Sequence, residues 1–164
     1  MDILDVSLIF STLSIALVAG FILTYAIVVM PGLSQLGDRE FLKAFQVTDG
    51  VIQNNQPVFI VIWLGSVVSV AGAIVSSITT VGWQEAWLIV VVGTAYLIGV
   101  QGITISVHLP LNNRIQKMNI SGMNDQAVSE ERRKFEARWN VFNNIRTGIA
   151  LFASVSLLIL LAVR

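Results

Sequence analysis

Hydrophobic residues fall into four long blocks that are almost free of charge and are separated by polar segments. The blocks cover about residues 6–30, 58–80, 86–108 and 146–163. A helix needs about 20 apolar residues to cross a bilayer core of roughly 30 Å, because each residue adds about 1.5 Å. The pattern therefore predicts an all-α protein, namely a transmembrane four-helix bundle that forms a single domain over residues 1–164.

The connections between the blocks differ greatly in length. Residues 81–85 form a tight turn, whereas residues 31–57 and 109–146 are long and polar. With four spans, the two long connections lie on the same side of the membrane, and together they hold every Lys and Arg except Arg164. The positive-inside rule therefore predicts a multi-pass protein of the plasma (inner) membrane with both long loops in the cytoplasm and both termini outside.

Each long connection contains a further helical pattern. In the first one, Asp38 is suited to cap a helix in which Phe41 and Phe45 lie one turn apart. This predicts an amphipathic surface helix in the first cytoplasmic loop, with both Phe side chains facing lipid or the mouth of the bundle. In the second one, a turn at residues 119–125 precedes a stretch without Gly or Pro from Ser129 to Arg146. The fourth helix is therefore expected to be long and to extend into the cytoplasm.

Composition removes several classes of function and partner. The net charge is zero and there is no basic face, which argues against binding to nucleic acid. With no Cys and one His, thiolate chemistry, iron–sulfur clusters and bis-His haem are excluded, and neither a metal nor a cofactor is predicted. The expected partners are membrane lipids and a hydrophobic small molecule, with a homo-oligomer as an open alternative.

Polar side chains within the spans are informative because they are costly in a bilayer. In the third span, Gln101 and His108 lie seven residues apart on one helix face, which we expect to look into the bundle. Pro110 lacks an amide donor and is expected to end or kink the helix. Asn112 and Asn113 would then lie at its cytoplasmic mouth.

The fourth span brings a matching polar set to the same end. Trp139, Asn143 and Arg146 share one face at spacings of four and three residues. Three more amides complete the predicted cup: Asn140 on the neighbouring face, and Gln46 and Asn55 in the first long connection. Such a cup would bind a flat, lipophilic molecule that carries carbonyl or phenol oxygens.

Each of these residues also has a structural interpretation. His108 could simply hydrogen-bond its neighbours, and Arg146 could reach to lipid phosphates at the membrane surface. The amides could join helices together or cap a broken helix end. The residue pattern leaves both interpretations open.

The order of several short motifs indicates a family. The motifs are Pro31-Gly32-Leu33, Phe41 with Ala44 and Gln46, Asn55 with Pro57, His108-Leu109-Pro110-Leu111-Asn112-Asn113, and Arg138-Trp139-Asn140 with Arg146. Together they resemble the anthrone oxygenase-like family of small membrane proteins, many of which have no assigned function. The chain departs from the family pattern at residues 54–57, where one residue separates Asn55 from Pro57.

This resemblance implies an oxygenase that converts anthrones to anthraquinones without a metal or organic cofactor. It implies that His108 is the catalytic base, and that Asn112 and Arg146 stabilise the developing oxyanion. The substrate would contact seven residues: Trp139, Asn140, Asn113, Asn143, Gln101, Gln46 and Asn55. The leading prediction is an oxidoreductase for a phenol-, anthrone- or quinone-like molecule. The alternative is a non-catalytic protein, either a lipid- or quinone-binding module or an accessory subunit of a membrane complex.

Overall fold

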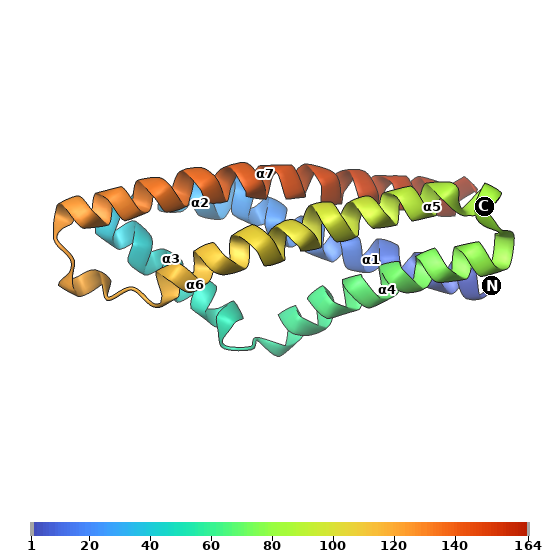
Figure 1. Ribbon diagram of the computed structural model, residues 1–164, viewed down its shortest axis with the longest axis horizontal. Helices are drawn as coiled ribbons and strands as arrows, with labels where there is room; N and C mark the ends of the chain where they lie inside the picture. Colours follow the sequence, from blue (N-terminus) through green and yellow to red (C-terminus); the bar gives the residue numbers. More distant parts are fainter. Residues whose placement is uncertain (1, 164) are drawn as a thin grey trace.

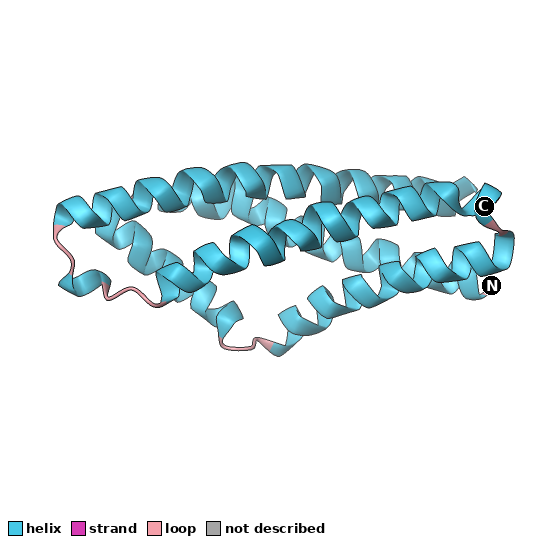
Figure 2. Cartoon of the chain, in the orientation of Figure 1, coloured by secondary structure: helices cyan, strands magenta, loops and turns pink. Residues whose placement is uncertain are grey.

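Helices make up nearly all of residues 2–163, which are the residues that this computed structural model describes, and no strand occurs among them. The elements in chain order are α1 (Ile3–Thr24), η1 (Tyr25–Val29), α2 (Met30–Leu33), α3 (Asp38–Gln53), α4 (Pro57–Val81), α5 (Trp83–Tyr96), η2 (Leu97–Gly102), η3 (Thr104–His108), α6 (Leu109–Gln116), η4 (Ile120–Gly122) and α7 (Asp125–Val163). Loops are confined to the ends of the helices (Figure 2). The predicted all-α fold is confirmed.

Four continuous helical stretches are long and apolar enough to cross a membrane. They are Ile3–Leu33, Pro57–Val81, Trp83–Gln116 and Asp125–Val163. They lie side by side, with both termini at one end and the long connections at the other (Figure 1). Four such stretches are typical of a multi-pass membrane protein, as the hydrophobic blocks predict.

Local signals in the sequence explain where the helices begin and end. Asp2 and Asp5 form a capping box at the start of α1, in which each carboxylate accepts the backbone amide of the other residue. At α4, Gln56 Oε1 accepts the amide of Phe59, and Pro57 occupies the first turn. The turn into α5 is made at Gly82, whose φ of 77° is readily adopted only without a side chain.

Two apolar clusters hold the elements together. The cluster near the termini joins α1, α4, α5 and α7, and Leu8, Val92 and Leu157 belong to it. The cluster near the long connections joins α3 to α7, where the rings of Phe45 and Phe135 are 4.5 Å apart. Burial of both clusters supplies the main packing energy within the protein, whereas many outward apolar side chains remain exposed, as lipid-facing side chains are.

The α3 helix lies in the first long connection, where the apolar spacing predicts a helix, and it packs beneath α7 (Figure 1). Phe41 and Phe45 are fully buried against α7, so they face the other helices rather than lipid. The apolar face of α3 thus places this helix across the ends of the third and fourth spanning helices.

Of the two effects expected of Pro110, an end or a kink, the end does not occur in the third spanning helix. The chain continues as α6 to Gln116 without a break. Two π-helical segments, η2 and η3, lie just before the proline. A π turn is wider than an α turn, and it therefore accommodates the missing amide hydrogen bond and the proline ring.

Candidate functional site

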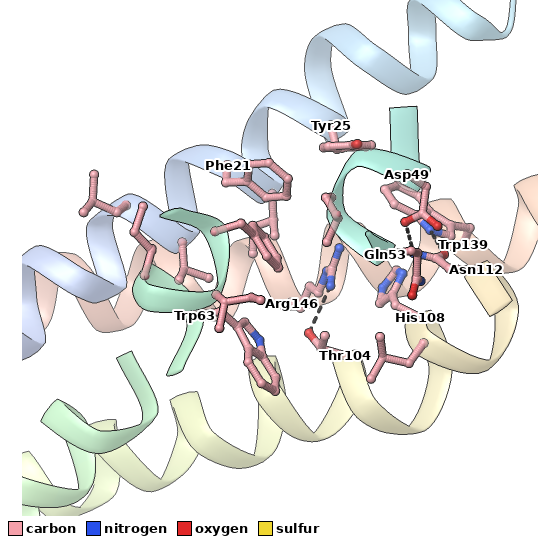
Figure 3. A pocket seen from close by; sticks show the side chains of 18 of the residues that line it. Phe21, Tyr25, Asp49, Gln53, Trp63, Thr104, His108, Asn112, Trp139 and Arg146 are labelled. Atoms are coloured by element: carbon pink, nitrogen blue, oxygen red, sulfur yellow. Dashed lines mark hydrogen bonds between the residues drawn. The ribbon is translucent and has the colours of Figure 1, made fainter. Parts of the chain in front are cut away.

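A cavity of about 360 Å³ lies between α1, α3, α4, η3 and α7 (Figure 3). One end is apolar and is formed mainly by Leu17, Phe21, Phe59 and Trp63. The other end is polar and is formed by Tyr25, Asp49, Thr104, His108, Asn112, Trp139 and Arg146. The volume falls within the range of small-molecule sites, about 300–1,000 Å³, and the division into two ends suits a lipophilic molecule with a polar group.

π-helical turns present several of the polar side chains to this cavity. Tyr25 is the first residue of η1, while Thr104 and His108 are the first and last residues of η3. Such turns occur frequently at functional sites, because the extra residue in the turn changes the direction of the side chains around it. Here they turn polar groups from two spanning helices toward one space.

His108 is buried with no side-chain hydrogen-bond partner within residues 2–163, although the backbone of Phe142 acts on its ring. Its side chain is 2% exposed, and neither ring nitrogen makes a hydrogen bond to another side chain in that part of the protein. Its ring packs edge-on against Trp139, with 4.9 Å between centroids and an angle of 82°. A neutral imidazole always has one nitrogen with a free lone pair, so the ring can accept a proton from a molecule in the cavity.

Arg146 is a buried cation without an opposing charge. Its side chain is 7% exposed, and none of the ion pairs in the described part of the chain includes it. Nε and Nη2 donate to Asn143 Oδ1 over 3.1 and 2.9 Å, and Nη1 donates to Thr104 Oγ1 over 3.0 Å. Two of the five guanidinium N–H groups thus remain for a ligand, and an anionic oxygen would offset the cost of this buried charge.

Asn112 connects three helices at the polar end. Its Oδ1 accepts the indole N–H of Trp139 over 3.0 Å, and its Nδ2 donates to Asp49 Oδ1 over 2.7 Å. Only one N–H of Asn112 is then left for a ligand. Its capacity to stabilise an oxyanion is therefore smaller than that of Arg146.

Sequence reasoning did not identify Asp49, which lines the cavity from α3 and is 2% exposed. Burial raises the pKa of the Asp49 carboxyl, while hydrogen bonds from Gln116, Gln53 and Asn112 oppose that shift. A signal was present in the sequence. Asp49 comes one turn after Phe45 on the apolar face of the predicted surface helix, where a carboxylate requires partners.

The family model for anthrone oxygenase matches residues 51–156. The chain belongs to the anthrone oxygenase family. The match includes His108, Asn112, Trp139 and Arg146, whereas Asp49 lies before its first residue. No curated protein and no solved structure matches the chain.

The site residues expected from the anthrone oxygenase resemblance divide into three groups. The structure brings five of them to the cavity: His108, Asn112, Trp139, Arg146 and Asn55. Two others, Asn143 and Gln101, do not line the cavity but form buried hydrogen bonds near it. Asn143 holds Arg146 and donates to the carbonyl of Ile22, and Gln101 donates to Ser66 and Tyr96.

Three further residues that the sequence placed in the site do not line this cavity. Gln46 donates to the carbonyls of Ile115 and Met118, so it fastens α3 to the end of the third spanning helix. Asn113 is exposed, and Asn140 lines a separate depression between α2 and α7. Within residues 2–163, no three His, Cys, Asp or Glu side chains gather as a metal site would require.

Proposed function

We propose that the protein is a membrane oxygenase that oxidises a lipophilic phenol-, anthrone- or quinone-like molecule without a cofactor. The observation that carries this proposal is the pairing of His108 with Arg146 at the polar end of one apolar cavity. The base has no side-chain hydrogen-bond partner within residues 2–163, and the cation has no carboxylate there. A substrate that becomes an anion when it loses a proton meets both requirements.

In the first step, His108 removes a proton from the acidic ring carbon of an anthrone-type substrate. The electron pair of the broken C–H bond moves to the substrate oxygen and gives an enolate. The two free N–H groups of Arg146 stabilise this negative oxygen, and the remaining N–H of Asn112 is a weaker donor. The apolar end of the cavity holds the rest of the ring system and keeps water away.

Dioxygen is the oxidant and accepts four electrons in total. The enolate gives one electron to dioxygen, and the resulting carbon radical and superoxide combine to a peroxide, which takes back the proton from His108. His108 then removes the second proton of the same carbon while the O–O bond breaks. One oxygen atom remains as the new carbonyl, and the other leaves as water together with the two transferred protons.

The location of the cavity fits a substrate that is dissolved in the membrane. The polar end lies on the side of the two long connections, where Lys and Arg are concentrated. We place this side in the cytoplasm and both termini outside a plasma (inner) membrane. The substrate would then enter with its apolar part in the bilayer and its oxygen toward the cytoplasmic surface.

Oxygen uptake by the purified protein in lipid vesicles, with anthrone as the probe, tests the proposal. We expect anthraquinone to form with one atom from ¹⁸O₂ in the new carbonyl, at a rate above the protein-free control. His108→Ala should lower the rate by about 10²–10⁴-fold, because the base is lost. A rate that equals the protein-free control, or a rate unchanged in His108→Ala, would refute the proposed mechanism.

Arg146→Gln tests the oxyanion contact, and Arg138→Gln is its matched control on the same helix. Arg138 is exposed and stacks on Phe142 away from the cavity. We expect Arg146→Gln to lower the rate by about 10²–10³-fold and Arg138→Gln to leave it unchanged. Equal losses in both variants would mean that general damage to α7, rather than the oxyanion contact, explains the effect.

A non-catalytic lipid- or quinone-binding role is the second candidate. It is supported by the apolar wall of Leu17, Phe21, Phe59 and Trp63, which would bind a lipophilic ring whether or not it reacts. Native mass spectrometry of the wild type and of Arg146→Gln separates the two roles. A co-purified quinone that is lost in the variant, without oxygen uptake in the wild type, would favour the binding role.

A further inference from the structure

We infer that Asp49 is a positioning residue that sets the orientation of His108 through Asn112 and Trp139. The inference concerns a residue before the part of the chain that matches the family. It rests on the proposed role of His108 as the base. The polar end of the cavity in Figure 3 contains all four side chains.

Three hydrogen bonds and one ring contact form the chain of interactions. Gln116 Nε2 donates to Asp49 Oδ2 over 3.0 Å, and Asn112 Nδ2 donates to Asp49 Oδ1 over 2.7 Å. The indole N–H of Trp139 donates to Asn112 Oδ1 over 3.0 Å. The rings of Trp139 and His108 then pack at 82° to each other, with 4.9 Å between their centroids. The contacts connect α3 through α6 to α7 and back to the end of η3.

The direction of each hydrogen bond is fixed by the chemistry of its ends. An indole nitrogen only donates, so Asn112 must turn its oxygen toward Trp139 and its NH₂ toward α3. Gln116 must also present its NH₂, because the same group donates to the carbonyl of Gln46 over 3.0 Å. Residue 49 therefore faces the donors of Asn112 and Gln116, in addition to that of Gln53, and only a carboxylate can accept from all of them without offering a donor.

The chain matters for His108 because no side chain within residues 2–163 holds its ring by a hydrogen bond, and the backbone of Phe142 is the one hydrogen-bonding group that acts on it there. Both ring nitrogens lack side-chain partners within residues 2–163, so the tilt of the ring depends on packing against Trp139. Trp139 is 2% exposed, and its own orientation depends on the hydrogen bond to Asn112. Proton transfer from carbon is sensitive to such placement, since an error of about 1 Å can cost roughly 100-fold in rate.

Exchanging the two side chains tests the inference. In Asp49→Asn, the new side chain has one oxygen and one NH₂ group. Its NH₂ must face the NH₂ of either Asn112 or Gln116, so that one hydrogen bond is replaced by two donors that face each other. In Asn112→Asp, two carboxylates face each other. The double variant Asp49→Asn/Asn112→Asp restores the pattern: the carboxylate at 112 accepts from Trp139 and from the amide at 49, whose oxygen accepts from Gln116.

Two readouts are measured for the wild type, both single variants and the double variant. The first is kcat and KM for anthrone oxidation. The second is the NMR signal of the Trp139 indole N–H, identified by its loss in Trp139→Phe. Glu40→Gln is the matched control, because it also converts a carboxylate of α3 to an amide but is exposed and outside the cavity.

We expect each single variant to shift the indole signal and to lower kcat by roughly 10- to 100-fold with a smaller change in KM. The double variant should recover both readouts, and Glu40→Gln should leave both unchanged. An indole signal that does not move in Asp49→Asn overturns the inference. Recovery of the signal without recovery of kcat also overturns it, since Asp49 would then act on the substrate directly.

Failure of the proposed function gives a different result. If the wild type takes up no oxygen, the indole signals of the four proteins still show whether Asp49 controls Trp139, while the oxygenase proposal is refuted. If the single variants fold poorly, the double variant still tests whether Asp49 orients Trp139 through Asn112. Recovery of folding together with the wild-type indole signal supports the chain of contacts, and continued misfolding overturns it.

Discussion

The buried carboxylate of Asp49, which forms no ion pair within residues 2–163, makes stability depend on pH. The folded-state pKa of Asp49 is raised above its ordinary value of 3.8, mainly through burial. Asp49 therefore contributes most to stability below pH 3.8, and this contribution is lost as the pH rises through the raised pKa, because the unfolded chain releases its proton first. We expect the unfolding midpoint of the wild type minus that of Asp49→Asn to be higher at pH 3.5 than at pH 7, because only the wild type titrates at this position. A constant difference would contradict the raised pKa.

Individual residues differ in how far their role could be predicted from the sequence. His108 and Arg146 were recognisable because a polar side chain within an apolar block always requires an explanation. Asn112 and Trp139 were recognisable from helix spacing near the same mouth of the bundle, and both also occur in the family motifs. Asp49 was not, because its partners, Asn112 and Gln116, come from a helix more than 60 positions later along the chain. Such pairings depend on how α3 packs, which no local pattern reveals.

At the scale of elements, Arg132 on α7 fastens the turn between α2 and α3. Its guanidinium donates to the carbonyls of Ser34 and Leu36 and to the carboxylates of Asp38 and Glu136. It also lies 4.4 Å from the centre of the Phe41 ring. The single ammonium group of a lysine could not replace the planar guanidinium, which donates in several directions at once.

We expect Arg132→Lys to destabilise the protein by about 1–3 kcal/mol, because several hydrogen bonds are lost while the charge is kept. Arg133→Lys is the control, since Arg133 is exposed and adjacent. Thermal unfolding in detergent measures the effect, and hydrogen exchange should rise in α3. An equal effect in both variants would show that the contacts of Arg132 contribute nothing specific.

The third spanning helix shows what local rules miss at this scale. Pro110 is unfavourable inside an α-helix, and the expectation of a break followed from that rule. The rule fails here because η2 and η3 widen the helix before the proline. The helix therefore continues to Gln116, whose side chain reaches α3. The hydrophobic blocks were sufficient to predict the spans, but not these changes of helix type.

At the scale of the whole molecule, the absence of Cys gives a direct test of topology. Ser121→Cys in the second long connection and Gln84→Cys in the tight turn each introduce a single thiol at an exposed position. The α4–α5 turn and the connection between α6 and α7 lie at opposite ends of the helices (Figure 1), so an impermeant maleimide should label only one of the two thiols from each side. We expect labelling of Gln84→Cys in intact cells and of Ser121→Cys only after lysis. The reverse result would invert the proposed orientation.

The uninterrupted α7 helix fixes how deep the site lies. The 17 residues of α7 that follow Arg146, residues 147–163, carry no charge, and at about 1.5 Å per residue they extend about 26 Å, close to the thickness of a hydrocarbon core. We therefore propose that the polar end of the cavity sits at one boundary of that core and that its apolar end lies within it. A substrate would be supplied by diffusion in two dimensions, so its mole fraction among the lipids, rather than its aqueous concentration, would determine saturation. Diluting the same amount of substrate with inert lipid should therefore slow turnover.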